Sequence, residues 1–105
     1  MTRLQLANDT HIKDSFLKTA KEVADYIDIL EVGTPAVLAH GMTLVREISE
    51  ILPDHEILAD MKIVDGGYLE AAMAFESGAD IVTVLGFASF KTISEVRKAA
   101  DQFGG

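Results

Sequence analysis

Short apolar runs alternate with amphipathic stretches along the whole chain, and this alternation limits the fold more than any other feature of the sequence. Four apolar runs have the length and composition of buried strands, at 4–9, 27–32, 56–62 and 81–85. Four stretches have the apolar spacing of helices, at 14–26, 40–52, 67–77 and 92–103. Strands that alternate with helices favour right-handed crossovers, which make the sheet parallel. The sequence therefore predicts an α/β fold of four consecutive βα units in one domain, residues 1–105.

The composition narrows the class of protein. Of the 105 residues, 49% are hydrophobic, which is enough for a core, whereas no apolar run is long enough to span a bilayer. Nine basic and 17 acidic residues give a net charge of −8, and that field repels nucleic acid and anionic membranes. The chain has no cysteine, which excludes disulfides and thiolate chemistry. With no secretory signal before the first strand, we expect a cytoplasmic protein that binds neither nucleic acid nor membranes.

The run from Ile57 to Gly67 carries the densest group of reactive side chains. Its apolar strand leads into Asp60, Lys62 and Asp65, spaced Asp-x-Lys-x-x-Asp, and two glycines end it. Because strand side chains alternate, Asp60 and Lys62 should point to the same face, about 6.6 Å apart along the strand. Two carboxylates around an ammonium group can share protons, bind a divalent cation or stabilise an enolate-like charge. A salt bridge that only caps the strand end is the simpler alternative.

Acidic residues also end the neighbouring strands. Asp9 closes the first strand, and Glu31 lies near the end of the second. In a parallel sheet these ends lie along one edge with Asp60 and Lys62, and ligands bind at that carboxyl edge in barrels and in open α/β sheets. Three acids and one lysine at successive strand ends indicate a functional cluster rather than four separate caps.

Four segments in chain order carry a family resemblance: LQLA with Asp9, ILEVGTP at 29–35, LADMKIVDGG at 58–67 and GADIVTVLG at 78–86. They resemble the 3-hexulose-6-phosphate synthases, which belong to the orotidine-5′-phosphate decarboxylase superfamily. The 3-keto-L-gulonate-6-phosphate decarboxylases are similar members of that superfamily. The Gly33-Thr34-Pro35 segment and the TVLG segment at 83–86 are more similar to the synthases.

The resemblance implies a carbon–carbon lyase that depends on Mg²⁺, with Mn²⁺ as an alternative ion. Such enzymes form an enediolate by taking a proton or carbon dioxide from a ketose phosphate, and the synthase adds the enediolate of ribulose 5-phosphate to formaldehyde. By position, Glu31 and Asp60 resemble the metal ligands, and Lys62 resembles the residue that stabilises the enediolate oxygen. Two carboxylates suffice for Mg²⁺, which fills its octahedron with water and substrate oxygens.

The resemblance assigns roles to the remaining positions as well. Asp9 corresponds to a residue that binds substrate hydroxyls and orients the lysine, and Glu31 and Gly33 join it among the substrate-binding positions. Asp65, counted with Lys62 and Asp60 as catalytic, corresponds to a residue that reaches the site of the neighbouring subunit.

Four βα units amount to half of a (β/α)₈ barrel, which takes about 200–250 residues when closed. The resemblance places this chain in the N-terminal half, and places phosphate-binding loops, a histidine and an arginine in the other half. Two functions therefore stay open, a lyase or part of one, and a non-catalytic half-barrel module. In either case we expect a homodimer or larger assembly that covers the open sheet, by closing an eight-stranded barrel or by packing face to face.

Some positions depart from the family or are expected to be structural. Asn8 stands where the family has leucine and should face the helices, where an unpaired amide costs about 1–3 kcal/mol. His40 is expected on the surface, at the start of the second helix. Thr92 or Ser94 is expected to cap the last helix.

Overall fold

The computed structural model describes all 105 residues as four βα units in sequence. The elements are β1 (Gln5–Asn8), α1 (Lys13–Val23) with a 3₁₀ turn η1 (Ala24–Tyr26), β2 (Ile29–Val32), α2 (Thr34–Ile51), β3 (Glu56–Ile63), α3 (Gly67–Glu76), β4 (Ile81–Val84) and α4 (Phe90–Phe103). The alternation read from the sequence is confirmed. None of the helices has both the length and the apolar composition needed to cross a lipid bilayer.

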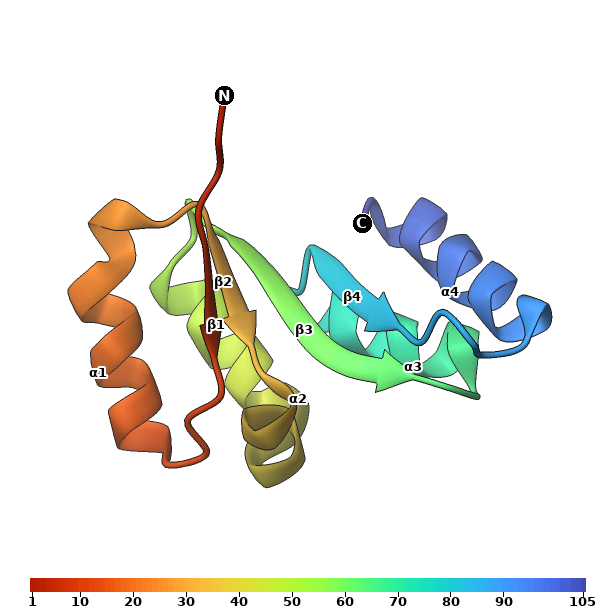
Figure 1. Cartoon of the computed structure of the whole chain (residues 1–105), viewed down its shortest axis with the longest axis horizontal. Coiled ribbons are helices and arrows are strands. Elements are labelled where there is room, and N and C mark those ends of the chain that lie inside the picture. The colour runs from red at the N-terminus through yellow and green to blue at the C-terminus, as the bar shows by residue number, and fades with distance from the viewer.

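The four strands form one parallel sheet in chain order, β1-β2-β3-β4. The helices lie on one side of this sheet, and its other face is uncovered (Figure 1). Consecutive parallel strands with helices on one side are the arrangement of half of a (β/α)₈ barrel. All strands point the same way, so their carboxyl ends share one edge.

The core lies between the sheet and the helices. Leu30, Val32 and Ala59 face the helices from their strands and are fully buried. Helix α2 contributes Leu44, Val45 and Ile48, each fully buried, as the apolar spacing predicts. A second, smaller cluster joins β3 to α3 and α4, and consists of Ile63, Ala71, Phe75, Val96, Ala99 and Ala100.

Helix α2 begins earlier than the sequence reading expected. The sequence predicts that Gly33-Thr34-Pro35 ends the second strand and that no helix begins before His40. In the structure the helix begins at Thr34, with Pro35 in its first turn. The reason is that proline is well tolerated there, since its fixed φ suits a helix and its missing N–H has no partner to lose. Gly41, with φ of 60° and ψ of −154°, is not helical and divides α2 into two segments, the second of which begins where the apolar spacing predicts.

Asn8 faces the helices, as alternation predicts, and its amide is paired. Its Nδ2 donates to the carbonyl of Phe16 at 3.3 Å, and its Oδ1 accepts from the backbone N–H of Thr10 at 3.2 Å. Asn8 is only 4% exposed, but because both ends of its amide are hydrogen-bonded, its burial does not carry the free-energy cost of an unpaired amide. The side chain joins β1 to α1.

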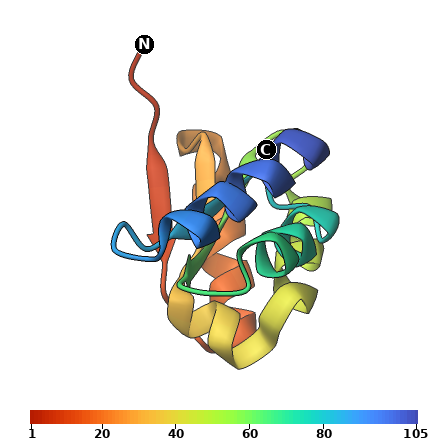
Figure 2. The same ribbon diagram turned by 90° about the vertical axis from the view of Figure 1, so that its right-hand side faces the viewer.

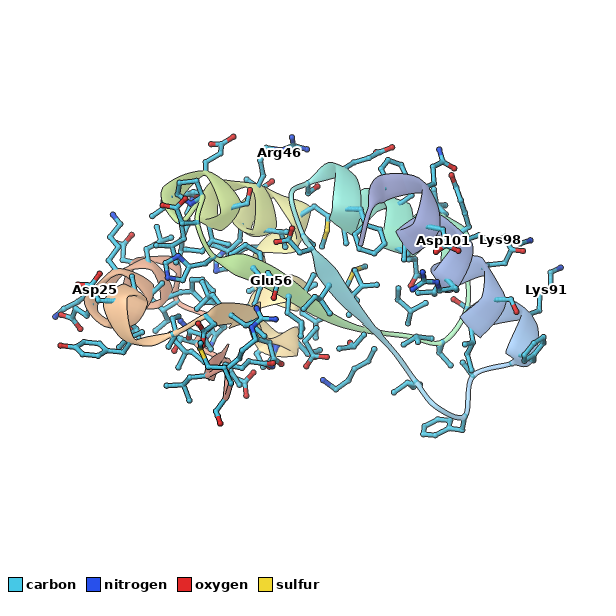
Figure 3. The ribbon with its side chains drawn as sticks, turned by 90° about the horizontal axis from the view of Figure 1, so that it is seen from above. Asp25, Arg46, Glu56, Lys91, Lys98 and Asp101 are labelled. Atoms are coloured by element: carbon cyan, nitrogen blue, oxygen red, sulfur yellow. The ribbon has the colours of Figure 1, made fainter.

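Two further expectations concern the cap of α4 and the position of His40. The cap of α4 is Ser89, whose hydroxyl accepts from the N–H of Thr92, so the cap lies upstream of the expected Thr92 or Ser94. His40 is half-buried within α2, six residues after the first residue of the helix, and its Nε2 contacts the carbonyl of His11 at 2.7 Å. Charged helix residues such as Arg46 and Lys91 point away from the ribbon (Figure 3).

Helix α4 packs mainly on α3 rather than on its own strand (Figure 2). Between α4 and β4 lies an apolar groove of about 310 Å³, lined by Ile81, Val82, Val84, Ile93, Val96 and Ala100 among others. On the uncovered sheet face, Leu58, flanked by β2 and β4, is only 8% exposed. The groove and the free edges of β1 and β4 have no partner in this chain.

We expect this chain to self-associate through the sheet edges and the groove. Covering a few hundred Å² of apolar surface contributes several kcal/mol at about 25 cal/mol per Å², and pairing the two edges satisfies their backbone groups. Light scattering at increasing concentration should show a mass above 11.4 kDa, and the melting temperature should rise with concentration. A folded monomer whose melting temperature does not depend on concentration would contradict this expectation.

Candidate functional site

The candidate site lies at the carboxyl edge of the sheet, where β1, β2 and β3 end next to one another. Asp9 follows β1, Glu31 lies in β2, and Asp60 and Lys62 lie in β3. The arrowheads of the strands in Figure 1 all point to this edge. Because parallel pairing aligns the strands, residues distant in sequence reach one place, the edge at which α/β proteins bind ligands.

Asp60 is the most enclosed charged residue of the cluster, at 8% exposure. Its Oδ1 accepts a hydrogen bond from the Thr83 hydroxyl at 2.7 Å, and its Oδ2 contacts the Thr34 hydroxyl at 3.0 Å and pairs with the Lys62 ammonium. Burial alone would raise the pKa of Asp60, but the hydrogen bonds from Lys62, Thr83 and Thr34 outweigh it and lower that pKa. Asp60 is therefore held as a carboxylate.

Lys62 is held at both its backbone and its ammonium group. Its φ of 48° lies in the left-handed region, which costs a non-glycine residue about 1–2 kcal/mol. Its N–H donates to the Thr83 hydroxyl at 2.9 Å, and its Nζ donates to the Thr34 hydroxyl at 2.7 Å. The side chain is 51% exposed, so the ammonium group is fixed by its partners yet open to the uncovered face.

Glu31 has the opposite electrostatic situation from Asp60. Its Oε2 accepts from the Gln5 amide at 2.6 Å, but no cation pairs with it. Partial burial raises the pKa of Glu31, and the charges of Asp60 and Asp9 raise it further, against the Gln5 hydrogen bond that lowers it. The edge therefore holds more negative charge than Lys62 compensates.

Gly33 allows the Asp9 carboxylate to lie against the start of α2. A Cβ at Gly33 would overlap Asp9 Oδ1 and would lie 2.8 Å from the carbonyl oxygen of Asn8. The N–H of Gly33 donates to that same carbonyl at 2.9 Å. The absence of a side chain is thus what lets the ends of β1 and β2 meet.

Asp65 differs from the other candidate residues. It lies in the exposed bend between β3 and α3, and no hydrogen bond or ion pair joins it to Asp60 or Lys62. Its role stays a prediction, and its exposure leaves it accessible to another chain.

Comparison with known proteins identifies the family. Residues 2–105 match the model of the orotidine 5′-phosphate decarboxylase / HUMPS family. The chain belongs to this family. The 3-hexulose-6-phosphate synthase of Mycobacterium gastri is 45% identical over 98 residues, which cover 93% of this chain and 47% of that protein.

Solved structures of family members share the fold. A crystal structure of a 3-hexulose-6-phosphate synthase superposes with a TM-score of 0.96 at 43% identity, covering 98% of this chain and 50% of that one. The 3-keto-L-gulonate-6-phosphate decarboxylase of Vibrio cholerae superposes with a TM-score of 0.96 at 39% identity, covering 98% of this chain and 48% of that one. This chain spans about half the length of the curated relatives it matches. The resemblance read from the sequence and the half-barrel fold are both confirmed.

Three residues of the site were not anticipated from the sequence as members of the cluster: Thr34, Thr83 and Gln5. Thr34 and Thr83 hold Asp60 and Lys62, and Gln5 holds Glu31. Strand alternation could have found Thr83 and Gln5, because each side chain points to the same face of the sheet as the candidate residue on the neighbouring strand, Asp60 for Thr83 and Glu31 for Gln5. Thr34 follows the glycine that ends β2, and its hydroxyl becomes visible as a partner only when α2 is known to begin there.

The carboxylates of this family member suit a hard cation, although no three of its acidic or histidine side chains converge into a complete metal cage. Mg²⁺ is usually held by one or two carboxylates, with water and substrate oxygens as its other ligands. Glu31 and Asp60 lie close enough for the charge of Asp60 to raise the pKa of Glu31. The carboxylate of Glu31, which has no cationic partner, lies beside that of Asp60, and these two residues would hold a divalent cation.

Gly33→Ala should destabilise the protein by about 1–3 kcal/mol, because the added methyl overlaps the Asp9 carboxylate and crowds the backbone of Asn8. Gly86→Ala is the matched control, since a Cβ there has no atom within 4 Å. Urea unfolding of both variants measures the difference. Equal stabilities would show that Asp9 moves aside freely and that the close approach has no structural consequence.

Proposed function

We propose that this chain carries the cation-binding and enediolate-stabilising part of a 3-hexulose-6-phosphate synthase site, which joins formaldehyde to ribulose 5-phosphate. The observation that carries the proposal is the Lys62 ammonium, held by Asp60 and Thr34 beside Glu31 at the carboxyl edge of the sheet. The similarity to synthases along nearly the whole chain supports it.

The reaction requires an electron-rich carbon on the ketose phosphate. Removal of the C1 proton of ribulose 5-phosphate leaves an enediolate, whose C1 attacks formaldehyde. A carbon–carbon bond forms, the formaldehyde C=O becomes a C–O single bond, and its oxygen takes a proton to become a hydroxyl group. The negative charge develops on the substrate oxygens, so a fixed cation there favours the transition state over the ground state.

In this scheme each residue of the cluster has a distinct task. Lys62 places its ammonium group next to the developing oxyanion, and Asp60 holds that ammonium group in place. Glu31 and Asp60 would hold Mg²⁺, which when bound supplies further positive charge to the substrate oxygens. Asp9, exposed next to Gly33, would accept hydrogen bonds from substrate hydroxyl groups.

A decarboxylase of the 3-keto-L-gulonate-6-phosphate type is the second candidate, because its solved relative superposes equally well, with a TM-score of 0.96. Loss of carbon dioxide also leaves an enediolate, which takes up a proton instead of adding to formaldehyde. Lys62 would have the same task in both reactions. The two candidates therefore differ in substrate and not in the residues of this cluster.

The test is turnover with Mg²⁺ present, followed as formaldehyde-dependent loss of ribulose 5-phosphate. Lys62→Ala should lower kcat by about 10²–10³-fold and change KM much less, since the oxyanion exists only along the reaction path. Lys21→Ala, at an exposed position on α1, is the control and should keep the activity of the unmodified chain. Equal kcat in Lys62→Ala and the control would remove Lys62 from the chemistry, and absence of any turnover would favour a non-catalytic module.

Cation binding can be measured separately from turnover. Mn²⁺ titration, followed by water-proton relaxation, should show a site that Mg²⁺ competes for and that the Glu31→Gln/Asp60→Asn variant lacks. Glu50→Gln/Asp54→Asn changes the net charge equally at two exposed positions away from the carboxyl ends of the strands, and should bind as the unmodified protein does. The metal assignment is wrong if the two double variants bind Mn²⁺ alike.

A further inference from the structure

Strand β4 meets β3 with an irregular register next to the site. Ala59 is paired with Val82 and Ile63 with Val84, so three residues of β3 stand opposite the single residue Thr83. The three residues include Asp60 and Lys62, and the second of these has a left-handed φ of 48°. The charged pair thus lies on a bulge, where the backbone ladder between the strands is interrupted.

The Thr83 hydroxyl bridges this interruption. Its oxygen accepts the N–H of Lys62 at 2.9 Å, and its hydrogen goes to Oδ1 of Asp60 at 2.7 Å. A hydroxyl group has only one hydrogen. Because Thr83 donates that hydrogen to Asp60, its oxygen must act as the acceptor for the N–H of Lys62. One side chain therefore holds the backbone of the lysine and the carboxylate of the aspartate together.

The other side of the pair is held differently. Thr34 contacts Oδ2 of Asp60 and accepts from the Lys62 ammonium, both from the start of α2. Thr83, and not Thr34, accepts from the Lys62 backbone, at the bulge that sets where this side chain leaves the strand, whereas Thr34 contacts the backbone carbonyl of Asp60 at 2.8 Å. If that backbone relaxed toward ordinary strand geometry, the ammonium group would leave its place between Asp60 and Thr34.

We propose that Thr83 is a positioning residue that fixes the bulged backbone of Lys62 and orients the Asp60 carboxylate, so that the ammonium group is presented to the substrate. The proposal rests on the proposed function for its effect on turnover, but its structural content can be tested without turnover. Thr83 contacts no reacting atom in this scheme and acts through Lys62 and Asp60.

Three variants test this role. Thr83→Val removes the hydroxyl at nearly constant volume, Thr83→Ser keeps it, and Thr43→Val makes the same change at an exposed position of α2. In NMR spectra of the labelled protein, Thr83→Val should speed hydrogen exchange at the Lys62 amide and shift the Lys62 ammonium signal. Thr83→Ser and Thr43→Val should leave both signals as they are in the unmodified protein.

Turnover separates positioning from a merely structural role. Thr83→Val should lower kcat about 10–100-fold with little change in KM, and Thr83→Ser should restore most of the loss. Unchanged Lys62 signals in Thr83→Val would overturn the proposal, as would an unchanged kcat in an active chain. If the unmodified chain shows no turnover, the proposed function fails, and the two NMR signals alone decide whether Thr83 positions Lys62.

Discussion

The parallel pairing of four strands in chain order is the constraint on which the rest of the structure depends. Each of the first three strands is followed by a helix that returns the chain to the amino ends of the strands. All carboxyl ends therefore lie on the same side of the sheet. Parallel pairing alone therefore brings together the acidic residues at the ends of β1, β2 and β3. No separate contact between their segments is needed for this. Burial of Leu30, Val32 and Ala59 against the helices fixes the register, because a shift of one residue would exchange buried apolar and open polar faces.

The fold could be predicted from the sequence because two periodicities were clear. Strands end at glycines or turn residues, helices carry apolar residues at helical spacing, and these rules locate the elements to within a few residues. The start of α2 was missed because Gly33-Thr34-Pro35 was interpreted as a break, although proline is compatible with a first helical turn. The local signal was ambiguous, and packing against the sheet decided it.

The charged part of the site was predictable for a different reason. Asp, Glu and Lys are rare at buried strand ends, so their position there is informative from sequence alone. Thr34 and Thr83 are less informative by residue type, since threonine is common in strands and in first helical turns; for Thr83 only its place on the strand face indicated the cluster. The left-handed backbone of Lys62 was also hidden, because nothing in the local sequence favours that φ over ordinary strand geometry. What the sequence could not show is the set of contacts that make the bulge stable.

The pKa values of the two central carboxylates, Asp60 and Glu31, are shifted in opposite directions by their surroundings. Asp60 is more enclosed, yet its pKa is lowered, because an ammonium group and two hydroxyl groups bind its charged form. Glu31 is less enclosed, yet its pKa is raised, because partial burial disfavours its charged form, the charges of Asp60 and Asp9 add to this, and the hydrogen bond from the Gln5 amide does not outweigh them. The ion pair thus neutralises one side of the cluster and leaves the other side in excess negative charge.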